Sequence, residues 1–318
     1  MTLYKYVTSE RIDVLQNELI RFTQPSALND PWDVRPHVER LLTDHDLEQL
    51  AAPLMRQTDE ELIDQISKII ENISKSHNLG NKSFDEIKQV VVEANREFPG
   101  ELKQLYEGVF TQTVETARQA LPQAIEFIPD ALDKTMGVLS LTEKPNHPLM
   151  WSHYTGNHSG FVLAFDEGHE FFRSPRYGEP DDMGSLRRVK YSSERPRFDP
   201  LVDMSLVNNM SDEYAISWLV KMFFTKSQEW AYEQEWRMLK PLDKANKMIE
   251  TPTGNVLLFS LPSGCVTGVI LGERMTAETR RQVVELVKTD QRYKHVTLFE
   301  ARASNKTFTI ELRPLEVE

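Results

Sequence analysis

The chain has 318 residues, with 37 lysines and arginines against 49 aspartates and glutamates, and a net charge of −12. This charge repels a phosphate backbone, so nonspecific nucleic-acid binding is not expected. The single cysteine excludes an internal disulfide and a cysteine-rich zinc module, and it fits a reducing compartment. No apolar run reaches about 18 residues and the start does not resemble a secretory signal, so we expect a soluble, cytoplasmic protein without a membrane span.

The first part of the chain predicts short strands around a short helix. Residues 3–7 and 19–23 are rich in aromatic and β-branched side chains, which is typical of strands. Residues 10–19 carry apolar side chains at helical spacing. Residues 25–33 are dense in proline, asparagine and aspartate, which indicates turns.

Residues 38–135 predict helices almost throughout. Residues 59–75 place isoleucine and leucine on one broad face, and Thr58 followed by Glu61 resembles a capping box. The helical period repeats over residues 83–98 and 101–121. We expect this stretch to be an insertion with a solvated acidic face, which can also serve as a surface for a protein partner.

The rest of the chain predicts strands with two helices. The helices are expected over residues 211–230 and 276–287, and the strands over residues 137–142, 160–165, 188–191, 235–239, 256–259, 266–271, 295–299 and 308–312. We therefore expect an α+β fold. Its discontinuous core, residues 1–37 and 136–318, would hold a mixed or antiparallel sheet, and residues 38–135 would be a helical insertion.

Polar and aromatic residues cluster near the start of the chain. Alternation on the first strand sends Tyr4 and Tyr6 to one face and Lys5 to the other. The two rings can stack a ligand or cap the edge of a core. Asn29 suits a turn, and Asp30 and Asp33 can bind a cation or a ribose hydroxyl, or serve the same turn.

Two further clusters lie in the second half. Ser140 and Thr142 share a strand face and indicate either an exposed edge or a polar pocket. Trp151, His153 and Tyr154 combine stacking rings with an imidazole that titrates near neutral pH.

The segment at residues 226–237 is the most informative one. A helix that ends near Trp230 would lead into a strand on which Glu233, Glu235 and Arg237 share a face. This pattern fits a solvated edge or an Arg–Glu ladder. It also fits an enzyme that holds a sugar and stabilises a positively charged ribosyl centre.

Several familiar arrangements are missing from the sequence. It has no glycine loop with phosphate-binding spacing, no histidine pair at i, i+4 around a glutamate, and no nucleophile elbow. We therefore predict no metal site.

In order, the clusters resemble the bacterial family known as domain of unknown function 2971. The similarity is carried by LYKY at 3–6, FTQPSALNDP at 22–31, LSLT at 139–142, MWSHY at 150–154, GFVLAFD at 160–166, WAYEQEWR at 230–237 and VTGVILG at 266–272. This family name implies no activity.

The order of parts also resembles the ADP-ribosyltransferase superfamily. Lys5 stands where that superfamily has arginine or histidine, which loses bidentate geometry, while Ser140 and Thr142 match its second motif. Glu233 and Glu235 match its late Glu-x-Glu.

The resemblance implies a role for each of these groups. Glu235 would hold the nicotinamide ribose and stabilise the oxocarbenium-like transition state, and Glu233 would position an acceptor or a water. Lys5 and Arg237 would meet the diphosphate. The nicotinamide would stack on one of four rings, those of Tyr4, Tyr6, Trp151 and Tyr154.

Three functions follow as expectations. The first is transfer or hydrolysis of ADP-ribose from NAD as substrate, in a toxin or phage-defence effector. The second is hydrolysis of a nucleotide or phosphodiester with Asp30, His153, Glu233 and Glu235. The third is a non-catalytic module that binds a small-molecule nucleotide or a peptide.

Overall fold

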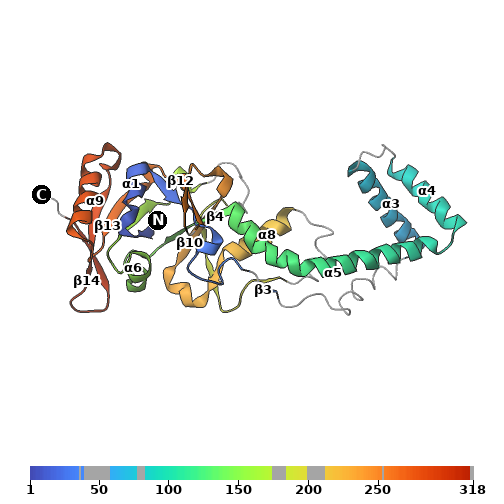
Figure 1. Cartoon of the computed structure of the whole chain (residues 1–318), viewed down its shortest axis with the longest axis horizontal. Coiled ribbons are helices and arrows are strands. Elements are labelled where there is room, and N and C mark those ends of the chain that lie inside the picture. Colours follow the sequence, from blue (N-terminus) through green and yellow to red (C-terminus); the bar gives the residue numbers. More distant parts are fainter. Residues whose placement is uncertain are drawn as a thin grey trace. The chain divides into compact units, whose positions relative to one another are not determined.

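Figure 1 shows a computed structural model of the chain, which describes residues 1–35, 37–38, 58–76, 83–173, 184–198, 212–252 and 254–315. The predicted helical structure over residues 39–57 and 77–82 lies outside these ranges. The chain divides into two compact units. The core unit is Met1–His37, Ile128–Pro196 and Ser211–Glu318, and the helical unit is Val38–Phe127 and Arg197–Met210.

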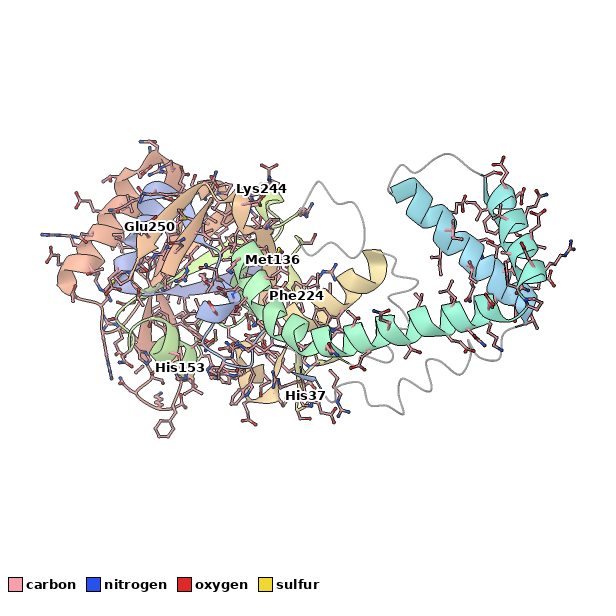
Figure 2. The ribbon with its side chains drawn as sticks, turned by 45° about the vertical axis from the view of Figure 1, so that its right-hand side comes forward. His37, Met136, His153, Phe224, Lys244 and Glu250 are labelled. Carbon is pink, nitrogen blue, oxygen red and sulfur yellow. The ribbon has the colours of Figure 1, made fainter. Side chains whose placement is uncertain are left out.

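The helical unit contains α3 (Asp59–Ser76), α4 (Phe84–Glu97) and much of α5 (Glu101–Thr135). The capping box before α3 is confirmed, since Glu61 N donates to Thr58 Oγ1 at 3.4 Å and Thr58 N donates to Glu61 Oε2 at 2.9 Å. The short strands β3 (His37–Val38) and β8 (Arg197–Phe198) lie at the boundaries between the units. The predicted end of the last helix at residue 121 is wrong because α5 continues through two prolines to Thr135, and β4 begins at Met136 (Figure 2).

The core unit is built on an eight-stranded sheet with the order β15-β14-β13-β5-β1-β4-β10-β6. Its strands are β1 (Thr2–Val7), β4 (Met136–Thr142), β5 (Phe161–Asp166), β6 (Arg187–Arg188), β10 (Glu235–Pro241), β13 (Val266–Leu271), β14 (Thr297–Ala303) and β15 (Ile310–Pro314). Neighbours are antiparallel except β13 and β14, which are parallel. The protein therefore has an α+β fold with a mixed, mostly antiparallel sheet.

The described part of the core unit also contains two smaller sheets, several helices and the end of α5. The sheets pair β11 (Lys247–Thr251) with β12 (Gly254–Ser260) and β2 (Leu19–Arg21), and β7 (Lys190–Ser192) with β9 (Thr225–Ser227). The helices are α1 (Asp13–Asn17), α6 (Pro148–Tyr154), α8 (Asp212–Phe223) and α9 (Ala277–Thr289). The 3₁₀ turns are η1 (Ser9–Ile12), η2 (Pro25–Ala27), η3 (Glu170–Phe172), η4 (Gln228–Glu233), η5 (Leu242–Lys244), η6 (Ser263–Cys265) and η7 (Gln291–Tyr293).

The helix predicted over residues 211–230 is too long. It ends at Phe223, because the next residues form β9 and pair in parallel with β7. Ser227 then caps the short turn η4 by accepting a hydrogen bond from Glu229 N. This change of structure places Lys226 on β9, within hydrogen-bond distance of Glu233 and Glu235.

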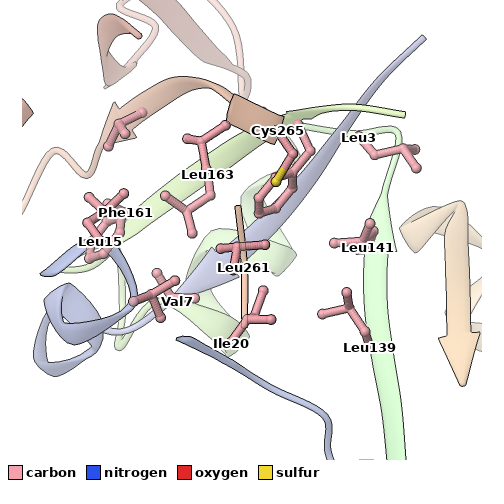
Figure 3. Close-up of a cluster of buried hydrophobic side chains, with 14 of the residues drawn as sticks. Leu3, Val7, Leu15, Ile20, Leu139, Leu141, Phe161, Leu163, Leu261 and Cys265 are labelled. Atoms are coloured by element: carbon pink, nitrogen blue, oxygen red, sulfur yellow. The ribbon is translucent and has the colours of Figure 1, made fainter. Parts of the chain in front are cut away.

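The largest apolar core fills the space between the main sheet, the β2–β12 sheet and α9. Figure 3 shows part of it, including Leu3, Leu163 and Cys265, which are fully buried. Alternation on β1 sends Leu3 and Val7 into this core, while Tyr6 joins a second cluster around Trp151.

The pairing of β1 explains where the site lies. All six residues of β1 pair with β5, but only Tyr4 pairs with β4, opposite Thr142. Farther along β4, Val138 forms an isolated bridge with Thr23. The two central strands therefore diverge beside Ser140, within the middle of the sheet.

Candidate functional site

A cavity of about 290 Å³ lies where β1 and β4 diverge. Its walls come from β1, β4, α6, the segment at residues 21–33, and the segment that runs from β9 through η4 into β10. The predicted residues that line it are Tyr4, Lys5, Tyr6, Asn29, Ser140, Thr142, Tyr154, Glu233, Glu235 and Arg237. These residues come from five separate parts of the sequence, and the fold places them around one space.

Arg237 forms the base of a buried ionic network. Its guanidinium donates to both carboxylate oxygens of Asp33, at 2.8 and 2.5 Å, and to both oxygens of Glu235, at 2.7 and 3.1 Å. A fifth bond runs to the carbonyl oxygen of Phe223 at 2.7 Å. Because arginine has five N–H donors, no donor remains for a ligand. The contacts therefore do not support the expected role of Arg237 in binding a diphosphate.

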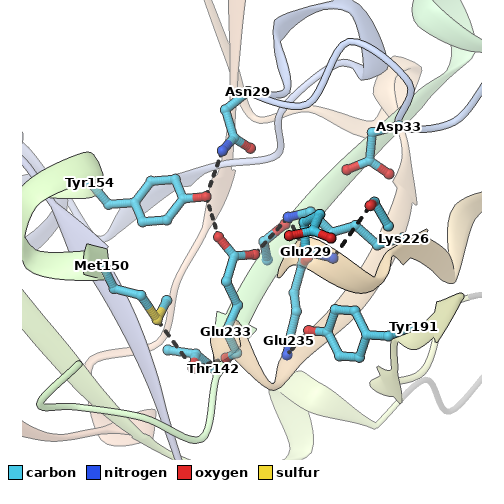
Figure 4. A network of polar contacts seen from close by, with 12 residues as sticks. Asn29, Asp33, Thr142, Met150, Tyr154, Tyr191, Lys226, Glu229, Glu233 and Glu235 are labelled. Carbon is cyan, nitrogen blue, oxygen red and sulfur yellow. Dashed lines mark hydrogen bonds and ion pairs between the residues drawn. The ribbon is translucent and has the colours of Figure 1, made fainter. Parts of the chain in front are cut away.

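Lys226 links the two glutamates of the network (Figure 4). Its Nζ donates to Glu233 Oε2 at 2.6 Å and to Glu235 Oε2 at 3.0 Å, with all three side chains at least 95% buried. Two carboxylates thus share one ammonium group. A buried charge needs such a partner, since removal from water disfavours the charged form.

The other side of Glu233 faces Tyr154. The Tyr154 hydroxyl donates to Glu233 Oε1 at 2.5 Å and accepts a hydrogen bond from Asn29 Nδ2 at 2.7 Å. Thr142 Oγ1 donates to the carbonyl oxygen of Glu233. Both the carboxylate and the backbone of Glu233 are therefore held in place.

The two carboxylates have pKa values shifted in opposite directions. Burial raises the pKa of Glu233, and this effect exceeds the opposing attraction of Lys226. Burial also acts on Glu235, but Arg237 and Lys226 outweigh it and lower the pKa of Glu235 to about 2. Glu235 therefore stays ionised at all ordinary pH values, while Glu233 gains a proton more readily than an ordinary glutamate.

The oxygens of the two glutamates differ in how many acceptor positions are occupied. A carboxylate has about four acceptor positions. Three N–H groups of Arg237 and Lys226 donate hydrogen bonds to the Glu235 carboxylate, and the Ser140 side chain provides a fourth hydrogen bond. Glu233 has two side-chain donors, Tyr154 and Lys226. Glu233 is thus the glutamate with acceptor capacity left for a ligand.

The local backbone differs from the prediction at this point. We expected Glu233 on the same strand as Glu235, but Glu233 ends η4 and Gln234 adopts a left-handed conformation with φ 44°. The strand begins only at Glu235. The prediction of one continuous strand is therefore wrong, although the two carboxylates still meet, at Lys226.

Lys5 lies on β1, beside the point where β1 and β4 diverge. Its Nζ donates to the carbonyl oxygen of Ser140 at 2.9 Å, where β4 pairs with β10 but no longer with β1. Burial lowers the pKa of Lys5 to about 8. Lys5 thus brings a positive charge to the cavity, within electrostatic reach of Glu235 and Glu233.

Three predicted residues do not line the cavity. Trp151 is fully buried, packs edge-on against Tyr6 at 5.5 Å, and donates to the carbonyl oxygen of Pro145. His153 is exposed on α6 (Figure 2). The Asp30 carboxylate accepts a hydrogen bond from Trp32 N at 2.9 Å, within a turn beside a separate cavity of about 210 Å³. Trp151 is thus kept out of the main cavity by its burial in the core, His153 by its exposed position on α6, and Asp30 by the turn that it stabilises.

Lys226 and Arg21 line the cavity and carry no predicted role. Asp33, predicted to serve the turn or to bind a cation or a ribose hydroxyl, instead holds Arg237. The sequence carried one usable signal: two glutamates and one arginine on a buried face need a second cation, and Lys226 is seven residues from Glu233.

The described ranges hold no group of three or more histidine, cysteine, aspartate or glutamate residues that could bind a metal ion. Within the same ranges, no helix combines the length and apolar character needed to cross a membrane.

Comparisons with known proteins point to the same part of the chain. No curated protein and no solved structure matched it. Residues 150–238 match the family described as "Protein of unknown function (DUF2971)". The matched range contains Tyr154, Lys226, Glu233, Glu235 and Arg237, and thus most of the charged network. Over residues 150–238, the chain is therefore similar to the DUF2971 family.

Proposed function

We propose that the cavity binds NAD and cleaves the bond between its ribose and nicotinamide, either transferring ADP-ribose to an acceptor or hydrolysing the dinucleotide. One observation carries this proposal. Glu233 and Glu235 are fixed by the same Lys226 Nζ at the wall of a cavity, and their pKa values are shifted in opposite directions. Such pairs commonly divide the acid–base and electrostatic work of an active site.

The chemistry requires a carboxylate near the anomeric carbon. The C1′–N bond breaks, its electron pair leaves with nicotinamide, and the ribosyl group becomes positively charged in the transition state. A water or an acceptor hydroxyl or amine then attacks C1′ and loses a proton. A positioned carboxylate can stabilise the charge and take up that proton.

The contacts favour Glu233 for this role. It has free acceptor capacity, and its raised pKa suits proton uptake. Glu235, which the superfamily resemblance placed at the ribose, has its oxygens occupied by Arg237, Lys226 and Ser140. We therefore assign Glu235 as a positioning residue that fixes Lys226, and through it Glu233.

The remaining walls suit a nucleotide. The rings of Tyr4 and Tyr154 line the cavity and offer stacking surfaces for a planar base, and Lys5 supplies positive charge. At about 290 Å³, the cavity lies at the lower end of the range for small-molecule sites, so it suits one nucleoside half of a dinucleotide.

The test compares nicotinamide release from NAD by the wild-type protein and by Glu233→Gln, with water and with added protein acceptors. We expect Glu233→Gln to lose at least about 100-fold in rate while keeping its unfolding transition. His153→Ala is the matched control and should retain the rate, because His153 is exposed outside the cavity. Equal release by Glu233→Gln and wild type, or no release by the wild type, would refute the proposal.

A non-catalytic nucleotide-binding module is a second candidate. The observation in its favour is that Arg237 and Glu235 satisfy each other and their neighbours, as in a purely structural network. Saturable binding of NAD without any product would support it. The phosphodiester hydrolase has less support, because Asp30 and His153 lie outside the cavity that contains Glu233 and Glu235.

A further inference from the structure

Three cations, Lys5, Arg11 and Arg21, lie close enough together to affect one another's pKa values. Lys5 and Arg21 line the cavity, and Arg11 lies in η1, directly after β1. Arg11 and Arg21 both lower the pKa of Lys5, and Arg11 also lowers that of Arg21, beyond the larger effect of burial. Three like charges thus lie within electrostatic reach of one another.

The guanidiniums in this group carry buried donors that lack partners. Arg21 Nε and Arg11 Nη2 are both buried without a hydrogen-bond partner in the described part of the chain. A buried donor without an acceptor loses its hydrogen bonds to water without replacement, and this loss is larger when the donor is charged. Such atoms are rare in folded proteins, and a ligand that supplies the acceptor is one explanation for them.

Nearby acids balance these charges only in part. Asp13 pairs with Arg11, through Nε at 2.9 Å. Glu235 raises the pKa of Lys5, but its oxygens are engaged by Arg237 and Lys226. Among the described residues, Lys5 Nζ has one hydrogen-bond partner, the carbonyl oxygen of Ser140, although an ammonium group has three donors.

We propose that Lys5, Arg11 and Arg21 form a phosphate-binding subsite at this end of the cavity. A phosphate group supplies several acceptor oxygens and negative charge, and it would satisfy both unpartnered guanidinium donors at once. The proposal deepens the proposed function, on which it rests for the identity of the ligand. In a dinucleotide the phosphates would lie at the Arg21 end and the reactive ribose at the Glu233 end.

The ligand test uses calorimetry with three probes: ADP-ribose, inorganic pyrophosphate, and nicotinamide riboside, which has no phosphate. Each probe is titrated into the wild type and into Arg21→Gln, Arg11→Gln and Arg313→Gln. Arg313 is the control because it lies on β15 and pairs with Glu311 at 2.8 Å on the surface. We expect Arg21→Gln and Arg11→Gln to lower the affinity for ADP-ribose and for pyrophosphate by about 10- to 100-fold. The affinity for nicotinamide riboside should stay unchanged.

A second measurement does not depend on activity. Removal of one of three like charges should leave the free protein equally stable or more stable, so Arg21→Gln should fold. Pyrophosphate should raise the melting temperature of the wild type but not that of Arg21→Gln.

The outcomes separate this proposal from the proposed function. If pyrophosphate binds through Arg21 and Arg11 but NAD is not cleaved, the phosphate subsite stands and the catalytic proposal fails. If ADP-ribose and pyrophosphate bind equally to all four proteins, or bind to none, the subsite is refuted.

Discussion

Arg237 and Asp33 lie 204 residues apart in the chain, and two nitrogens of the Arg237 guanidinium meet the two oxygens of the Asp33 carboxylate at 2.8 and 2.5 Å. Both side chains are fully buried. These two parallel hydrogen bonds connect the turn-rich segment near the start of the chain to β10, and both residues line the cavity. A pair of this kind fixes geometry as well as charge.

Replacement of Arg237 should strongly destabilise the protein. Arg237→Met leaves Asp33 and Glu235 buried with fewer partners, so we expect a loss of about 3–5 kcal/mol in the free energy of unfolding. Urea unfolding measures this. Arg313→Met is the control, because Arg313 and Glu311 are about half exposed and should contribute less than about 1 kcal/mol. A loss of similar size in both variants would contradict the structural role of Arg237.

Glu235 should make stability depend on pH in the acid range. Its pKa falls from 4.5 to about 2 in the folded protein, so its stabilising effect is complete above about pH 4.5 and is lost as the pH falls towards 2. The difference in unfolding free energy between wild type and Glu235→Gln should therefore shrink by about 3 kcal/mol from pH 5 to pH 2. A difference that stays constant over this range would show that Glu235 is not held ionised.

Lys5 should make stability depend on pH in the alkaline range, where stability again rises with pH. Burial lowers its pKa from 10.5 to about 8, so the unfolded chain binds more protons between these values and stability rises with pH. Between pH 8 and 10.5, the free energy of unfolding of the wild type should rise by about 1–3 kcal/mol relative to that of Lys5→Met. Parallel stability curves for the two proteins would contradict the burial of a charged Lys5.

Tyr154 should tune the proton affinity of Glu233. Its hydroxyl donates to Glu233 Oε1, and this bond lowers the Glu233 pKa against the effect of burial. In Tyr154→Phe the pKa of Glu233 should rise further, so the acidic limb of the rate of nicotinamide release should move to higher pH. Tyr6→Phe is the matched control, because the Tyr6 hydroxyl donates to the carbonyl oxygen of Lys144 instead. Equal profiles for the two variants would remove Glu233 as the titrating group.

Trp151 should prove structural. It is fully buried against Tyr6 and its indole N–H is bound by Pro145, so Trp151→Ala should cost about 3–5 kcal/mol of unfolding free energy. His153→Ala should change stability by less than about 0.5 kcal/mol, because the side chain is exposed. Unfolding curves for both variants test this contrast. A small effect of Trp151→Ala would reopen its role as a stacking surface.

Much of the core unit could be predicted from local pattern. The alternation in residues 3–7 and 266–271 and the helical spacing in residues 276–287 correspond to β1, β13 and α9, because side-chain periodicity follows directly from backbone geometry. Prediction failed near residues 223–235. Helix propensity continues past Phe223 there, but the pairing of β9 with β7 overrides it.

The sequence by itself determined which chemical groups the site would contain. It showed two glutamates and an arginine close together, tyrosines on the first strand, and motifs typical of one family. Only the tertiary structure decided which charges are free and which are paired. The partner of Arg237 lies 204 residues away, the short turn η4 brings Glu233 to Lys226, and the divergence of β1 from β4 opens the cavity that Arg21 lines. Long-range pairing of charges depends on distances across the fold, and no local period in the sequence encodes those distances.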